Sequence, residues 1–205
     1  AKAMREIELV RGTPRKVCCI TYTNTAAQEI EQRTSLETQP GDEEYFAVST
    51  IHAFCLTEIY RPYGWLLPSF RGTARVITRE NPDFERIAVY AAERVNLLRL
   101  SPADYEAFES LTMNAAGQIV GLAANNEAIV RAAPYWWERC AELGYVDFGT
   151  IIYGSYCVLR DNPQIAMSLA AKFPWFLIDE FQDTTDLQIE LLKLIHATAR
   201  SRFFL

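Results

Sequence analysis

A short apolar strand that runs directly into a cluster of acids constrains the fold of this chain more than any other feature. Residues 176–184 read Phe-Leu-Ile-Asp-Glu-Phe-Gln-Asp-Thr. The apolar run Trp175–Ile178 is typical of a buried parallel strand, and ligands of open α/β sheets bind beyond the carboxyl ends of such strands. Successive side chains at a strand end point in different directions. We therefore expect Asp179 to be able to hold a hydrated Mg²⁺ while Glu180 faces an attacking water.

Two further strand-to-helix turns lie upstream. Residues 16–22 contain the apolar run Val-Cys-Cys-Ile and predict a buried strand. Thr25 and Gln28 then have capping-box spacing, which predicts a helix over about residues 26–33. Residues 45–49 alternate like a strand that leads into Thr50, with a helix expected over residues 53–60.

Three segments of the chain resemble, in the same order, conserved motifs of the superfamily 1 helicases of the UvrD/Rep/PcrA type. Residues 176–184 resemble the Walker B motif of this family. Residues 22–33 (YTNTAAQEIEQR) are similar to the block that grips single-stranded DNA, and residues 50–55 (TIHAFC) to the next DNA-contacting loop. The segment Tyr145–Phe148 also fits the family, and the resemblance spans nearly the whole chain.

The resemblance implies an α/β fold class: a partial RecA-like P-loop NTPase core with a parallel sheet and an inserted all-helical subdomain. The core is expected to consist of residues 1–60 and 145–205, and the insertion of residues 61–144. Helices are predicted from apolar spacing and breakers, over residues 1–10, 85–100, 103–111, 118–131, 135–143, 147–159 and 186–197.

The family pattern assigns three residues to the nucleotide. Asp179 would bind Mg²⁺ through water, Glu180 would be the catalytic base, and Gln182 would link the nucleotide state to the DNA side. An isolated acidic turn is more often a solvated helix N-terminus whose dipole the carboxylates offset. Asp183 or Thr184 could equally cap the helix that follows.

The same pattern assigns DNA contacts to Thr23, Asn24, Thr50 and His52. The hydroxyl and amide groups would bind phosphate, and the imidazole would stack on a base or hydrogen-bond to the backbone. Each residue has a structural alternative, because Thr and Asn commonly cap helices and a lone histidine is usually structural. Tyr22 stands where the family often has phenylalanine and could be a core residue.

The activity implied is that of an ATP-dependent DNA helicase of the repair and recombination type, which uses ATP and Mg²⁺. Its partners would be single-stranded DNA, DNA junctions and the remaining motor domain of the same protein. Two alternatives stay open: the motor part of an AddA/RecB-like helicase-nuclease, and a non-catalytic DNA-binding or scaffold module with a degenerate motor fold. The 205 residues contain no phosphate-loop sequence G-x-x-x-x-G-K-[ST]. We therefore expect an excerpt of a larger helicase that is inactive by itself.

Composition restricts the remaining classes. No apolar run reaches the roughly 20 residues needed to cross a bilayer, so a cytoplasmic protein without a membrane partner is expected. Five cysteines without a C-x-x-C pair indicate reduced, structural thiols. The net charge of −6 argues against a nucleic-acid partner, but residues 61–99 hold seven Arg against four acids. Trp136 and Trp137 could form a stacking platform, although one of them is expected in the core.

Overall fold

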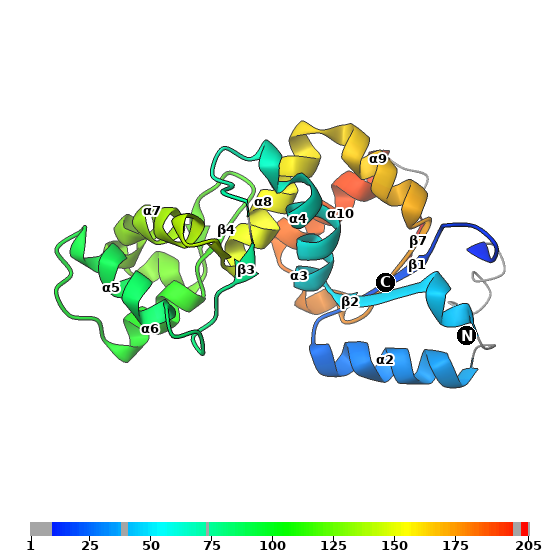
Figure 1. Ribbon diagram of the computed structural model, residues 1–205, viewed down its shortest axis with the longest axis horizontal. Coiled ribbons are helices and arrows are strands. Elements are labelled where there is room, and N and C mark those ends of the chain that lie inside the picture. The colour runs from blue at the N-terminus through cyan, green and yellow to red at the C-terminus, as the bar shows by residue number, and fades with distance from the viewer. Residues whose placement is uncertain (1–9, 38–40, 73, 199–201, 205) are drawn as a thin grey trace. The chain divides into compact units, whose positions relative to one another are not determined.

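The computed structural model describes residues 10–37, 41–72, 74–198 and 202–204 (Figure 1). Apart from Val10, the helix expected over residues 1–10 lies outside the described residues. The chain forms two compact units, one made of Ala1–Glu58 with Val158–Leu205 and the other of Ile59–Cys157. Residues 145–157, which we expected in the sheet core, therefore group with the second unit. The assignment of residues 61–144 to an inserted subdomain stays a prediction.

The first unit is built around a parallel sheet with the strand order β2-β1-β7-β8. Its strands are β1 (Val17–Thr21), β2 (Phe46–Thr50), β7 (Trp175–Ile178) and β8 (Arg202–Phe204). All five residues of β1 are buried, as expected of a central strand that is covered on both faces. Each of the three predicted strands is found within one residue of its expected limits, which confirms the parallel α/β core.

Aromatic rings fill one face of this sheet. The rings of Phe54, Phe173 and Phe176 pack edge to face, with centroids 5.8 or 5.9 Å apart. Phe173 follows α9 (Pro163–Lys172), and His196 of α10 (Asp186–Thr198) packs against Phe203 of β8. On the opposite face, Ile30 of α2 (Asn24–Glu37) packs against the buried cluster that includes Val17 of β1. Burial of these side chains is what orders the strands.

The helix expected after β2 is found with an irregular centre. It begins as α3 (Ile51–Phe54), continues as a π-helical segment (Cys55–Tyr60) and ends as α4 (Arg61–Tyr63). π-helical turns are rare in proteins, and those that occur are often found at functional sites. The segment is tied to α9 by an ion pair of 2.6 Å between Glu58 and Lys172.

The second unit consists mainly of α5 (Phe84–Glu93), α6 (Pro102–Glu109), α7 (Glu127–Glu142) and the first part of α8 (Phe148–Asp161). Trp136 of α7 is fully buried, and its ring lies 5.0 Å from that of Phe84 and 5.2 Å from that of Phe108. The unit also contains a parallel ladder of β3 (Arg75–Val76) with β6 (Tyr145–Val146). We expected an all-helical subdomain, but this unit also contains short strands.

The predicted limits fail between residues 111 and 143. The helices expected over residues 118–131 and 135–143 are one helix, α7, preceded by an antiparallel hairpin of β4 (Thr112–Met113) and β5 (Ile119–Val120). Asn126 starts α7 by accepting a hydrogen bond of 3.2 Å from the Ile129 backbone N–H. Pro134 lies inside the helix at an exposed position, where water can reach the carbonyl that proline leaves without a donor.

A buried carboxylate ties α7 to α8. Asp147 Oδ2 accepts hydrogen bonds from the indole N–H groups of Trp136 and Trp137 at 2.8 and 2.9 Å, and its Oδ1 accepts the Thr150 backbone N–H at 2.7 Å. Burial raises the pKa of Asp147, outweighing these hydrogen bonds, which lower it. Because Trp136 is in the core and both indoles bind Asp147, Trp136 cannot belong to a stacking platform.

The cysteine prediction is confirmed: all five are buried, free thiols. Burial raises the pKa of Cys19 to about 12, so this thiol stays protonated and unreactive near neutral pH. Among the helices of the described residues, none combines the length and the apolar character that a membrane span needs.

Candidate functional site

The carboxyl ends of three neighbouring strands meet at one edge of the sheet. Ile20 of β1 is level with Ile178 of β7, and Thr21 is level with Thr50 of β2. The backbone N–H of Asp179 donates to the Ile20 carbonyl at 2.9 Å, which extends the ladder by one residue. The acids after β7 are therefore held at the same edge as the ends of β1 and β2.

The backbone turns sharply at Glu180. This residue has φ 54° and ψ 42°, the left-handed conformation, which costs a residue with a Cβ about 1–2 kcal/mol. The turn is closed by the Asp183 backbone N–H, which donates to the Glu180 carbonyl at 2.9 Å. Outliers of this kind persist where surrounding structure enforces them, and they concentrate at functional sites. The separate roles expected of the Asp179 and Glu180 side chains stay a prediction.

The structure brings Glu180 and Gln182 together, because the Gln182 side-chain amide donates to a carboxylate oxygen of Glu180. Asp179 is exposed and, among the described residues, its carboxylate has no hydrogen-bond or ion-pair partner. The described residues contain no cluster of three or more metal-ligating side chains. A lone carboxylate suits Mg²⁺, which keeps several waters and takes substrate phosphate oxygens, so the donor set fits that ion.

A small hollow of 10 Å³ lies between the strand ends, with the room of about one water. Its lining includes Thr21, Tyr22, Asp179, Glu180 and Gln188. Gln188 is buried and forms a capping box with Thr185 at the start of α10: its Oε1 accepts the Thr185 backbone N–H at 2.9 Å. Thr21 and Gln188 were missed by the sequence analysis, since only the sheet reveals that they face the acids.

Thr23 begins the helix after β1. Its hydroxyl accepts the Ala26 backbone N–H at 3.1 Å, and its carbonyl accepts the Thr21 hydroxyl at 2.9 Å. The helix cap is therefore Thr23, and the expected capping box of Thr25 and Gln28 was wrong. Asn24 is the first residue of α2 and is exposed at this end.

Thr50 and His52 lie at the corresponding end of β2. The Thr50 hydroxyl caps α3 by accepting the Ala53 backbone N–H at 3.2 Å. His52 is half-buried, and burial lowers the pKa of its imidazole. It is therefore a neutral ring at physiological pH, able to stack or to share one hydrogen bond in each direction.

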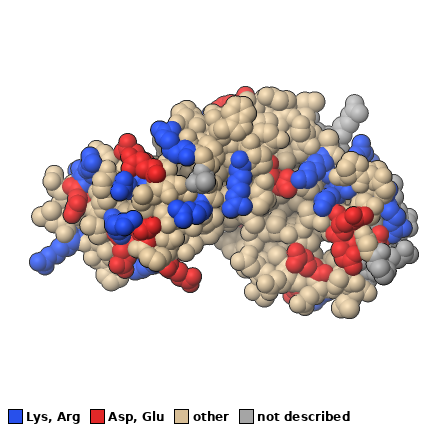
Figure 2. All heavy atoms as spheres, viewed as in Figure 1, with Lys and Arg blue, Asp and Glu red and all other residues tan. Residues whose placement is uncertain are grey.

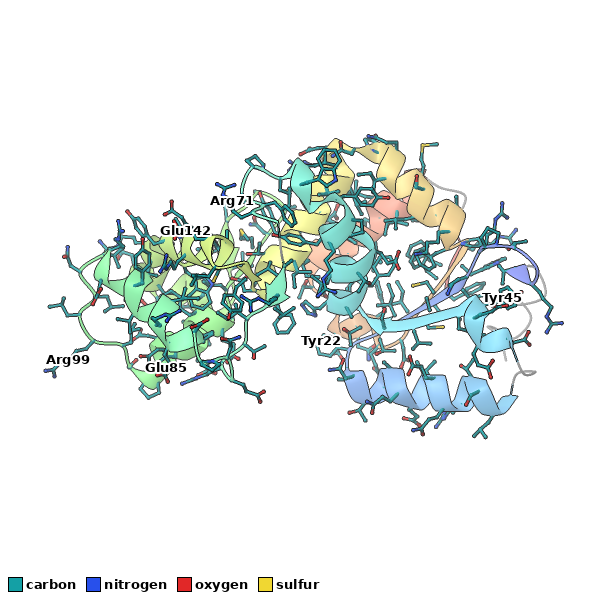
Figure 3. All side chains as sticks on the ribbon, in the orientation of Figure 1. Tyr22, Tyr45, Arg71, Glu85, Arg99 and Glu142 are labelled. Carbon is teal, nitrogen blue, oxygen red and sulfur yellow. The ribbon has the colours of Figure 1, made fainter. Side chains whose placement is uncertain are left out.

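The sequence left open that Tyr22 is a core residue, and the structure contradicts this. Its side chain is 52% exposed, and Figure 3 shows it at the turn between β1 and α2. The sequence does show an aromatic residue just before a helix N-terminus. Whether its ring is buried or exposed depends on the sheet and cannot be decided from the sequence.

Comparisons with known proteins agree with this arrangement. The model of the UvrD/REP helicase N-terminal domain family matches residues 1–205. The chain is 24% identical to the ATP-dependent DNA helicase Rep of Escherichia coli over 206 residues, which cover 95% of this chain and 30% of that protein. It is 26% identical to the ATP-dependent DNA helicase PcrA of Leuconostoc citreum over 192 residues, covering 89% of this chain and 25% of that protein.

A third relative is the ATP-dependent DNA helicase UvrD1 of Mycobacterium bovis, with 25% identity over 191 residues. These cover 87% of this chain and 24% of that protein. The chain thus spans about a quarter of the length of these relatives.

Proposed function

This chain belongs to the UvrD/REP helicase family through its N-terminal domain, and we propose that it forms the part of a DNA helicase motor that hydrolyses ATP beside a grip on single-stranded DNA. The observation that carries the proposal is the shared edge of the sheet. The acids after β7 and the polar residues after β1 and β2 follow strands that end at the same level. The residues proposed for the nucleotide and those proposed for DNA therefore follow neighbouring strand ends.

On the nucleotide side, we assign three roles. Asp179 would hold Mg²⁺ through water, and Glu180 would orient and deprotonate the attacking water. Bound Mg²⁺ would supply neutralisation of the phosphate charge. Gln182, which already contacts Glu180, would sense whether that carboxylate is engaged. The left-handed backbone at Glu180 supports a functional role for this residue, because such outliers concentrate at functional sites.

On the DNA side, Thr23, Asn24, Thr50 and His52 would bind the strand. The helix N-termini after β1 and β2 favour a negative phosphate, and the capping hydroxyls of Thr23 and Thr50 keep a lone pair for water or a second donor. The exposed ring of Tyr22 follows β1 directly and lines the hollow at the strand ends, and we add it as a base contact.

In the whole protein, this motor would couple ATP hydrolysis to translocation on single-stranded DNA and to duplex unwinding, together with the remaining motor domain. These 205 residues alone would not turn over ATP, because they contain no phosphate-loop lysine. The names of the relatives, which are ATP-dependent DNA helicases, support this extension.

The test is DNA-stimulated ATP hydrolysis and DNA affinity in the full-length protein. Asp179→Asn should lower hydrolysis and shift its Mg²⁺ dependence to higher concentration, with DNA affinity unchanged. Thr23→Ala should weaken binding of an oligothymidylate. Thr185→Ala is the matched control, since it also removes the capping hydroxyl of a helix in the same unit, at a similar cost of about 1 kcal/mol. Equal DNA affinity in both threonine variants would reject the grip at Thr23.

A further inference from the structure

A stretch of the second unit carries positive charge without any acid. Residues 59–79 contain four arginines and no Asp or Glu, in a chain whose net charge is −6. The same stretch contains four aromatic residues. Basic residues interleaved with aromatic rings are the composition of surfaces that bind single-stranded nucleic acid.

One of these rings stands in solvent. Trp65 is 68% exposed, the largest exposed fraction of any aromatic side chain among the described residues. Its indole N–H donates to the Pro62 carbonyl at 3.1 Å, which leaves the two faces of the ring open while it limits their rotation. An exposed ring that is already held in place loses little freedom when a base stacks on it.

The loop beneath Trp65 is packed and hydrogen-bonded. The Leu67 backbone N–H donates to the Gly64 carbonyl at 2.8 Å, and the Phe70 N–H to the Leu67 carbonyl at 3.1 Å. The Phe70 ring packs on that of Tyr60, with centroids 5.8 Å apart, and it lies so close to Gly64 that a Cβ there would come within 2.7 Å of it. Phe70 is thus half-buried against Tyr60 and Gly64, whereas Trp65 is exposed.

Two arginines, Arg61 and Arg71, lie within six residues of Trp65 in the sequence. Arg61 donates to the Ala74 carbonyl at 3.4 Å, and Arg71 donates to the Pro68 carbonyl at 2.7 Å. Neither forms an ion pair with another described residue, whereas Arg86 and Arg139 on the same unit are each paired with an acid at 2.7 Å. A guanidinium has five N–H donors, so both keep donors for a phosphate.

The surface views agree with this description. Figure 3 shows the Arg71 side chain directed outward from the connection between α4 and β3. On the face drawn in Figure 2, several basic side chains lie over the region of this connection, with an acidic group beside them.

We infer that Trp65, Arg61 and Arg71 form a second contact for single-stranded DNA, in which one base stacks on the indole and the adjacent phosphates bind the two guanidinium groups. The choice of DNA rests on the proposed function, and the choice of site on the exposure and charge of this loop. A protein partner that covered Trp65 would need acids to meet both arginines, whereas a single strand supplies a ring and two phosphates within one or two nucleotides.

The first experiment measures binding of a fluorescent oligothymidylate to the full-length protein by anisotropy. Trp65→Ala should bind about fivefold or more weakly, the equivalent of about 1 kcal/mol for the loss of one stacked base, and Trp65→Phe should recover part of the affinity. Leu122→Ala is the matched control, because Leu122 is an exposed apolar residue of the same unit, 53% exposed. Trp65→Ala equal to Leu122→Ala would overturn the inference.

The second experiment measures the salt dependence of the same affinity. Arg71→Ala and Arg61→Ala should each reduce the slope of log affinity against log salt by about 0.7, the value for one phosphate on a single strand. An unchanged slope in both variants would overturn the inference.

The third measurement compares wild type with the conservative Trp65→Phe variant, which keeps an aromatic ring at this position. The difference in tryptophan fluorescence between wild type and Trp65→Phe should be quenched by acrylamide and altered when oligothymidylate is added. If acrylamide fails to quench it, protein already covers the ring and the inference is wrong. If Thr23→Ala weakens DNA binding while all Trp65 and arginine variants bind normally, only the second contact fails. If wild type binds no DNA, the proposed function fails with it.

Discussion

Glycine should be more stabilising than alanine at position 180, which is the reverse of their usual order. Glu180 has φ 54°, and this conformation costs a residue with a Cβ about 1–2 kcal/mol. Glycine avoids that cost but loses about 0.4–1 kcal/mol through its greater freedom in the unfolded chain. Both variants lose the contact with Gln182, so this term cancels. Glu180→Gly should therefore be more stable than Glu180→Ala by about 0.8 kcal/mol, the difference between the midpoints of these two ranges.

The assay is hydrogen exchange of the amides of β7 in the full-length protein, because this strand leads into the turn. The expected difference in stability corresponds to exchange that is about two- to fivefold slower in the Gly variant. Both variants should also lose ATP hydrolysis, since neither carries a carboxylate. Faster exchange in Glu180→Gly than in Glu180→Ala would refute the claim that the site stores backbone strain.

Three other perturbations have defined outcomes. Burial raises the pKa of Asp147, so this group should stabilise the fold at pH below about 4 and lose that contribution as pH rises through the raised pKa. Asp147→Asn should flatten the pH dependence of the urea midpoint. An unchanged profile would contradict a raised pKa at Asp147. A Cβ at Gly149 would lie 2.0 Å from the Leu111 carbonyl oxygen. Gly149→Ala should therefore destabilise the second unit by several kcal/mol, although alanine is favoured over glycine in helices by about 1 kcal/mol. A Cβ at Gly154 would meet only side chains, so Gly154→Ala should lower the melting temperature less. Because burial lowers the pKa of His52, stability should fall as pH drops through about 6.5, and NMR titration of this ring should show a midpoint below that of an exposed histidine.

The strands were predictable because each is a short apolar run between turn residues. The run Val-Cys-Cys-Ile can bury both faces, so β1 had to be central, and Trp175–Ile178 carries the same signal. The acids at the end of β7 followed directly, because strand ends are where a parallel sheet presents polar groups. The capping box of α10 was equally readable from Thr185 and Gln188.

Other features depended on contacts that are remote in the sequence. The sequence predicted Thr25 as the helix cap, but the cap is Thr23, whose hydroxyl accepts the Ala26 backbone N–H. The Thr21 hydroxyl at the end of β1 also donates to the Thr23 carbonyl. The limits of α7 were missed because Pro134 is normally a helix breaker, yet Asn126 and the packing of Trp136 keep the helix continuous. The left-handed turn at Glu180 has no sequence signal, since glutamate rarely adopts it.

The exposure of aromatic residues was the least predictable property. Trp136 and Trp137 looked like the available rings, but Asp147 holds both indoles. Trp65 gives no periodic signal, and its exposure is visible only in the folded loop, where Phe70 packs on Tyr60 and beside Gly64. Burial of a single ring depends on the whole loop around it.

The central claim is that the acids after β7 hydrolyse ATP, and single-turnover hydrolysis by Glu180→Gln in the full-length protein tests it most directly, with ATP affinity measured in the same samples. Glutamine keeps the size of the side chain and its contact geometry but cannot accept the proton of the attacking water. The account predicts a rate about 100- to 10,000-fold below wild type with nucleotide affinity nearly unchanged. A wild-type hydrolysis rate in this variant would contradict it.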